Sequence, residues 1–178
     1  MSQATEAPIA GQAVPLFKAP DIVTGLRIPL AVGFLAFESA AVRLGIILVV
    51  AASDVVDGIW ARRVGGSRAG AVLDPVADKL FMLAAFVVVL QGGVLTLVEV
   101  AGVLIRDLTA LVAFLTTVVR RKATTLPARA GGKAVTILQG LTLVAFLAGS
   151  DLLRPLAWAT GAVSVYAIYD YTREAWRP

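Results

Sequence analysis

Two pairs of aspartates, Asp54 with Asp57 and Asp74 with Asp78, stand in a part of the chain that is otherwise mostly apolar. At about 100° per residue, each pair falls on one face of a helix, because its members are one helical turn apart. The loop around residues 64–68 is short enough to make the two helices antiparallel neighbours. We therefore expect the two acidic faces to meet, and this expectation constrains the fold more than any other feature of the sequence.

Four carboxylates brought together in an apolar environment repel one another strongly, so such a cluster is costly unless cations neutralise it. The chain contains no His and no Cys, and ligands that are all oxygen favour hard cations such as Mg²⁺ or Mn²⁺. Two such cations would bind a diphosphate and assist phosphoryl transfer. Gly58, Ala61 and Gly70 lie on the same helix faces and leave room for a ligand. The alternative, solvated helix ends that happen to carry Asp, suits one aspartate better than four.

The composition indicates a membrane protein. Of 178 residues, 58% are hydrophobic, and the mean hydropathy is +0.85, which is too apolar for an ordinary soluble domain. The length allows one domain. Without Cys or His, a disulfide framework, a thiolate nucleophile and a phosphohistidine are excluded, so direct transfer to an acceptor is the simplest expectation.

Apolar segments predict an all-α polytopic membrane protein with six transmembrane helices. We expect residues 1–19 to form a flexible, interfacial segment and not a signal peptide, residues 20–172 to form the transmembrane domain, and residues 173–178 to form a cytoplasmic tail. The predicted spans are residues 22–37, 44–63, 69–90, 95–119, 134–148 and 153–169.

The cationic residues predict the orientation. An even number of spans places both termini on one side, together with most of the sixteen Lys and Arg residues. The loops of the other side hold only Arg43 and Arg154. Because positive charge gathers on the cytoplasmic side, we expect the termini and the acidic pairs to face the cytoplasm. The membrane is expected to be that of a bacterial cell.

An ionisable pair, Arg106 and Asp107, lies inside the fourth predicted span. Such a pair is either part of a functional site or a mutually satisfied ion pair, and the sequence leaves both interpretations open. The basic, glycine-rich loop at residues 127–133 is either a phosphate-binding segment or a patch for lipid headgroups.

The acidic stretch as a whole resembles the signature of the CDP-alcohol phosphotransferase family, D-x2-D-G-x2-A-R-x(about 8)-G-x3-D-x3-D. All of its fixed positions are filled here, although Arg62 and Gly70 are separated by seven residues where about eight are usual. The matching residues are Asp54, Asp57, Gly58, Ala61, Arg62, Gly70, Asp74 and Asp78. The motif is far more specific than a lone glycine pattern, and the resemblance extends over most of the chain from Pro20 onward.

The resemblance implies transfer of a phosphatidyl group from a CDP-linked lipid to an alcohol, with release of CMP. Asp54, Asp57 and Asp74 would hold two divalent cations, Mg²⁺ or Mn²⁺. Asp78 would complete the second metal site and act as the general base on the acceptor hydroxyl.

A segment similar to the P-[ND]-x-x-T-x-x-R stretch of family members begins at Pro20, and in some relatives it lines the nucleotide pocket. On that basis Asp21 and Thr24 are expected at the CDP-lipid, with weaker support for Arg27. The other residues that the resemblance assigns to the CDP-lipid are Gly58, Ala61, Arg62, Ser67 and Gly70.

An acceptor that carries a phosphate needs cations near the metals, and Arg106, Lys133 and Arg173 are the candidates. The sequences 74–79 and 132–136 look most like the phosphatidylglycerophosphate synthase branch of the family, which uses glycerol 3-phosphate. The cardiolipin synthase branch, which uses phosphatidylglycerol, ranks second, and relatives that use inositol phosphate rank third.

The expected partners are CDP-diacylglycerol, a small alcohol phosphate and the lipid bilayer, without nucleic acid. Family members are often homodimers, which makes a second copy of the chain a partner to test. A hypothesis of a different class also stays open, because six spans with buried carboxylates would suit a divalent-cation transporter. Against it, both aspartate pairs lie near one end of their helices, and no acidic counterpart appears at the other end.

Overall fold

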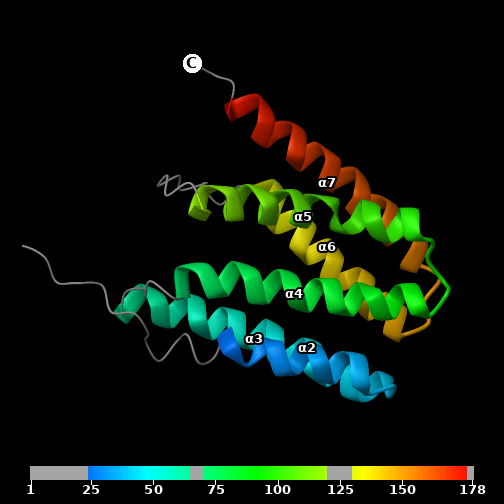
Figure 1. Ribbon diagram of the computed structural model, residues 1–178. Coiled ribbons are helices and arrows are strands. Elements are labelled where there is room, and N and C mark those ends of the chain that lie inside the picture. The colour runs from blue at the N-terminus through cyan, green and yellow to red at the C-terminus, as the bar shows by residue number, and fades with distance from the viewer. Residues whose placement is uncertain (1–23, 65–69, 120–129, 176–178) are drawn as a thin grey trace, which may run out of the picture.

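The computed structural model describes residues 24–64, 70–119 and 130–175, and in this part of the chain it contains α-helices and no strands (Figure 1). Their number agrees with the six predicted segments. The helices are α2 (Arg27–Ala36), α3 (Ala40–Val64), α4 (Gly70–Gln91), α5 (Leu97–Val119), α6 (Ala130–Leu147) and α7 (Leu153–Ala175).

The helix ends differ from the prediction where charged residues were assigned to loops. Arg43 lies inside α3, which begins at Ala40 instead of residue 44. Its guanidinium donates to the carbonyl of Phe34 and lies over the Phe34 ring, so it covers the carboxyl end of α2 from the next helix. Arg173 lies in the last turn of α7, beyond the predicted end at residue 169. A cation at this end of a helix interacts favourably with the helix dipole.

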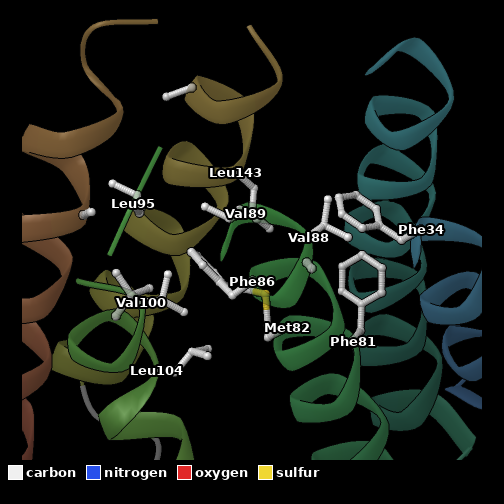
Figure 2. Close-up of a cluster of buried hydrophobic side chains, with 14 of the residues drawn as sticks. Phe34, Phe81, Met82, Phe86, Val88, Val89, Leu95, Val100, Leu104 and Leu143 are labelled. Atoms are coloured by element: carbon white, nitrogen blue, oxygen red, sulfur yellow. The ribbon is translucent and has the colours of Figure 1, made fainter. Parts of the chain in front are cut away.

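Helix α4 is the centre of the hydrophobic core. One of its sides packs on α2, where the rings of Phe34 and Phe81 meet edge to face with centroids 5.8 Å apart. Another side, with Phe86 and Val89, faces α5 and α6, as Figure 2 shows. Phe34, Phe86 and Val89 are fully buried. This packing fixes the start of α4, and with it the register of Asp74 and Asp78.

Helix α7 packs on α5 and α6. It approaches α5 closely at Gly102 and Gly161, where a Cβ built on Gly161 would lie 3.7 Å from the backbone of Gly102. Two helices can approach this closely because neither residue carries a side chain. The alternating direction of the chain brings the start of α2, the end of α3 and the start of α4 to one end of the bundle (Figure 1). We call it the acidic end.

Large apolar side chains remain exposed along α3, α5 and α7. Examples are Leu48, Val112 and Val165, each 61% exposed. The six helices agree with the predicted helical fold, but the predicted transmembrane character does not follow from them. Across the residues that the structure describes, none of the helices combines the length and the apolar character needed to cross a membrane.

Candidate functional site

Thr24, just before α2, and Arg27, its first residue, hold two of the signature aspartates. The hydroxyl of Thr24 donates to Asp74 Oδ1 at 2.6 Å, and Arg27 Nη2 donates to Asp54 Oδ1 at 2.9 Å. Thr24 and Arg27 are buried, whereas the Asp54 side chain is 72% exposed. The first segment of the fold is thus a rigid support for carboxylates on α3 and α4, and it leaves Asp54 open to the solvent side.

Asp78 is held by its neighbour in the chain. Lys79 Nζ lies 2.9 Å from Asp78 Oδ2 and 2.8 Å from Asp107 Oδ1 on α5. The two residues next to each other on α4 point about 100° apart around the helix axis, so the long side chain of Lys79 can reach both carboxylates. The ammonium therefore joins the signature residue on α4 to a buried carboxylate on α5.

Asp107 is fully engaged by protein groups. Its Oδ1 accepts from Lys79 and from Arg106 Nη1 at 3.0 Å, and its Oδ2 accepts from Gln139 Nε2 at 2.7 Å. The Gln139 amide also donates to the carbonyl of Val103 at 3.0 Å. This buried polar network resolves the two interpretations of the Arg106–Asp107 pair in part. The pair is mutually bonded, and it also connects to Asp78 through Lys79.

The three candidates for the acceptor phosphate lie in different surroundings. Arg106 is 14% exposed and is bonded to Asp107, whereas Lys133 and Arg173 are exposed. Lys133 is in the first turns of α6, and the end of α7 that carries Arg173 lies well apart from the start of α4 in Figure 1. Of the three, only Arg106 is connected to a signature aspartate by bonds within the described residues.

The profile of the CDP-alcohol phosphatidyltransferase family matches residues 17–167, which is most of the chain. The chain belongs to this family. No curated protein and no solved structure matches it. The CDP-alcohol phosphatidyltransferases are transferases that move a phosphatidyl group from a CDP-alcohol to an acceptor, so the chain is an enzyme of this class and the transporter hypothesis is set aside.

Several signature residues of this CDP-alcohol phosphatidyltransferase are only partly described. The backbone of α3 includes Asp57, Gly58, Ala61 and Arg62, but their side chains lie outside the described set. Asp21 and Ser67 lie outside the described residues altogether. Gly70 is buried at the first position of α4, on the helix that carries Asp74 and Asp78.

The predicted metal site fits a hard cation in its donor chemistry. Asp54, Asp74 and Asp78 offer carboxylate oxygens without nitrogen or sulfur ligands, as Mg²⁺ and Mn²⁺ prefer. In the bonds that the structure describes, each of the three uses one oxygen for a protein partner. Among side chains whose positions are described, no three acidic groups come close enough to hold a metal. The expected meeting of the acidic faces of α3 and α4 is therefore not confirmed among the described side chains, and the Asp57 side chain lies outside them.

A cavity of about 680 Å³ lies at the opposite end of the bundle from these aspartates. Val94, Phe146, Arg154 and Trp158 are among its walls, and none of the signature residues is. This cavity is therefore separate from the predicted site.

The sequence prediction missed Lys79 and Gln139 as parts of the site. The position of Lys79 directly after Asp78 is a signal that could have been used, since the chain has few cations inside its apolar segments. Gln139 is a single amide in an apolar helix. Its partner Asp107 is on a different helix, so its role depends on the way α5 and α6 both pack on α4 and α7.

Proposed function

We propose that the enzyme transfers the phosphatidyl group of CDP-diacylglycerol to glycerol 3-phosphate and releases CMP. The observation that carries the proposal is that Asp54, Asp74 and Asp78 are each held through one oxygen by a side chain of the acidic end. Such carboxylates are oriented before any ligand arrives, and in the described bonds each has a second oxygen that no protein group uses. This arrangement lowers the entropic cost of binding a cation and a diphosphate.

The residues of the chain divide the work in this proposal. Arg27 and Thr24 fix Asp54 and Asp74, and Asp54, Asp57, Asp74 and Asp78 would hold two divalent cations, Mg²⁺ or Mn²⁺. When bound, these cations would supply positive charge that offsets the charge of the diphosphate. The Asp78 oxygen that Lys79 does not contact accepts the proton of the acceptor hydroxyl as that hydroxyl attacks the phosphorus of the lipid phosphate. The bond from that phosphorus to CMP breaks.

The nucleotide and the acceptor are assigned to different residues. Asp21, Thr24, Gly58, Ala61, Arg62, Ser67 and Gly70 are proposed to contact the CDP-lipid, as the resemblance implies. Arg106 and Lys133, with Arg173, are proposed for the acceptor phosphate. The bonding of Arg106 to the network around Asp78 supports its place nearest to the reacting groups.

We also propose that the enzyme is an integral membrane protein with its acidic end toward the cytoplasm. The exposed apolar side chains of α3, α5 and α7 support this location, because large apolar side chains left exposed in number favour contact with lipid or with another protein. A lipid substrate requires the same contact. Retention of the protein in the membrane pellet after a carbonate wash is the expected result, and release by the wash would contradict this part of the proposal.

The test of the reaction is CMP release by the purified enzyme from CDP-diacylglycerol in the presence of Mg²⁺ or Mn²⁺. Glycerol 3-phosphate, phosphatidylglycerol and inositol phosphate are supplied one at a time. We expect release that depends on glycerol 3-phosphate and on the metal, and that is abolished by a chelator. Release with only one of the other acceptors would contradict the assigned acceptor but keep the chemistry, and absence of release with all of them would contradict the proposed function.

A further inference from the structure

The ammonium of Lys79 lies between two carboxylates of different kinds. Asp78 is one-third exposed and uses a single oxygen in its described bonds, whereas Asp107 is 3% exposed and uses both. Asp107 consequently offers no free oxygen to a metal or a substrate. In the structure Asp107 binds the ammonium of Lys79, the guanidinium of Arg106 and the amide of Gln139.

Gln139 and Arg106 keep Asp107 in place independently of Lys79. The Gln139 amide is anchored to α5 by its second bond, to the carbonyl of Val103. A carboxylate fixed in this way is a rigid attachment point, and a flexible lysine side chain bound to it loses most of its freedom to move into solvent. Lys79 is thus tethered beside Asp78, with 15% of its side chain exposed.

The network balances its charges within itself. Lys79 and Arg106 carry two positive charges, and Asp78 and Asp107 carry two negative charges. A divalent cation that binds Asp78 therefore meets a cation already paired with this carboxylate, and the two repel each other. A stronger hold of Asp107 on the ammonium reduces this competition, because it draws the positive charge toward α5.

We propose that Lys79 is a positioning residue for Asp78 and that Asp107 tethers it, so that the ammonium shares the Asp78 carboxylate with a divalent cation. The inference rests on the proposed function, in which Asp78 is both a metal ligand and the general base. Lys79 fixes the orientation of the carboxylate at one oxygen and leaves the other oxygen to face the reacting groups. Asp107 sets how much of the ammonium's charge Asp78 receives.

The proposal predicts opposite effects on metal affinity when the two residues are changed. Lys79→Met removes the competing cation, and we expect Mn²⁺ to bind about tenfold more tightly. In Asp107→Asn the Lys79 ammonium has Asp78 as its one carboxylate partner among the described residues. It then competes more strongly with the metal, and we expect Mn²⁺ to bind about tenfold more weakly. Both variants should turn over more slowly, with kcat reduced and the KM for CDP-diacylglycerol unchanged, because the orientation of Asp78 is lost in each.

Mn²⁺ affinity is measured on the full-length protein in detergent by the electron paramagnetic resonance signal of free Mn²⁺, without substrate. Lys79→Arg is the conservative variant and should keep most of the wild-type kcat. Matched control variants lie at the opposite end of the bundle. Arg154→Gln and Asp151→Asn remove the same charges there and should leave Mn²⁺ affinity unchanged. Thermal melting confirms that each protein is folded, and Lys79→Gln replaces Lys79→Met if the latter is not.

If Lys79 and Asp107 only support the local structure, both Lys79→Met and Asp107→Asn should weaken Mn²⁺ binding, because loss of packing around Asp78 lowers Mn²⁺ affinity in either variant. That result, or unchanged affinity in both, would overturn the proposal. The wild-type assay separates this failure from failure of the proposed function. If the wild type releases no CMP with any acceptor, the assigned reaction is wrong. If the wild type turns over but the two substitutions change Mn²⁺ affinity in the same direction, only the role of Lys79 is refuted.

Discussion

The two ends of the helix bundle both carry carboxylates, but they use them differently. At the end opposite to the acidic end, Glu99 uses both oxygens for protein partners. Oε2 accepts from the backbone N–H and the hydroxyl of Thr96, and Oε1 accepts from Arg154 and Trp158. At the acidic end, Asp54, Asp74 and Asp78 each use one oxygen in their described bonds. The first arrangement closes a turn, whereas in the second one oxygen of each aspartate has no partner among the described bonds.

The Glu99 arrangement belongs to the start of a helix. Thr96 and Glu99 form a capping box at the first turn of α5, in which the Thr96 hydroxyl also accepts from the Glu99 N–H. Arg154 and Trp158 then attach this turn to α7. Glu99 and the aspartates assigned to the proposed reaction thus differ in the number of oxygens that protein groups occupy in the described bonds.

The largest effect is expected for Asp74→Asn. The amide keeps the shape of the side chain and can still accept from Thr24, but it removes the negative charge that a divalent cation requires. We expect turnover to fall by more than about a hundredfold with little change in melting temperature. CMP release and thermal melting measure the two quantities. Turnover near the wild-type level would show that the Asp74 carboxylate is not needed as a metal ligand.

A smaller loss is expected for Arg27→Met, which removes the buried cation that holds Asp54. A hydrogen bond between charged groups contributes about 1.5–3 kcal/mol, so we expect turnover to fall between about tenfold and a hundredfold. The melting temperature should fall as well, since Arg27 is 3% exposed. Arg27→Lys serves as the control and should recover part of the activity. Equal activity of Arg27→Met and the wild type would contradict the role of α2 as a support.

Thr24→Val tests the weaker of the two supports. Valine has nearly the shape of threonine but cannot donate to Asp74, and the loss of one such bond should slow turnover about threefold to tenfold. Thr24→Ser keeps the donor and should turn over like the wild type. If the two variants were equally slow, the methyl group and not the hydrogen bond would be responsible.

The smallest effect on turnover is expected for Glu99→Gln at the opposite end. The substitution weakens the capping box and the attachment to Arg154, so the melting temperature should fall by a few degrees. The rate of CMP release, measured well below the melting temperature, should equal that of the wild type. A large loss of turnover in a folded Glu99→Gln protein would abolish the distinction between the two ends.

The sequence was sufficient for the elements that depend on local pattern. The six helical segments follow from apolar runs and from turns such as the one at Gly93, which has the positive φ of 69° that glycine accepts readily. The shared helix faces of Asp74 and Asp78 follow from their spacing alone. Thr24 was expected near the site because the stretch that contains it resembles a segment of family members. In the structure its hydroxyl donates to Asp74.

The remaining features depend on how separate helices pack. Asp107 and Gln139 are thirty-two residues apart and meet only because α5 and α6 lie against the same side of α4. No periodicity within one helix indicates which of its polar residues finds a partner on another. The capping box at Thr96 and Glu99 is different, because its local T-x-x-E spacing was available in the sequence, but its links to Arg154 and Trp158 were not.

The central claim is that the acidic end performs the transfer and that the opposite end supports the fold. The most direct test is one assay, CMP release from CDP-diacylglycerol vesicles with glycerol 3-phosphate and Mg²⁺, on the wild type, Asp78→Asn and Glu99→Gln. We predict equal release by the wild type and Glu99→Gln, and no release above background by a folded Asp78→Asn protein that still binds CDP-diacylglycerol. Retained release by Asp78→Asn, or its loss in Glu99→Gln alone, would contradict the claim.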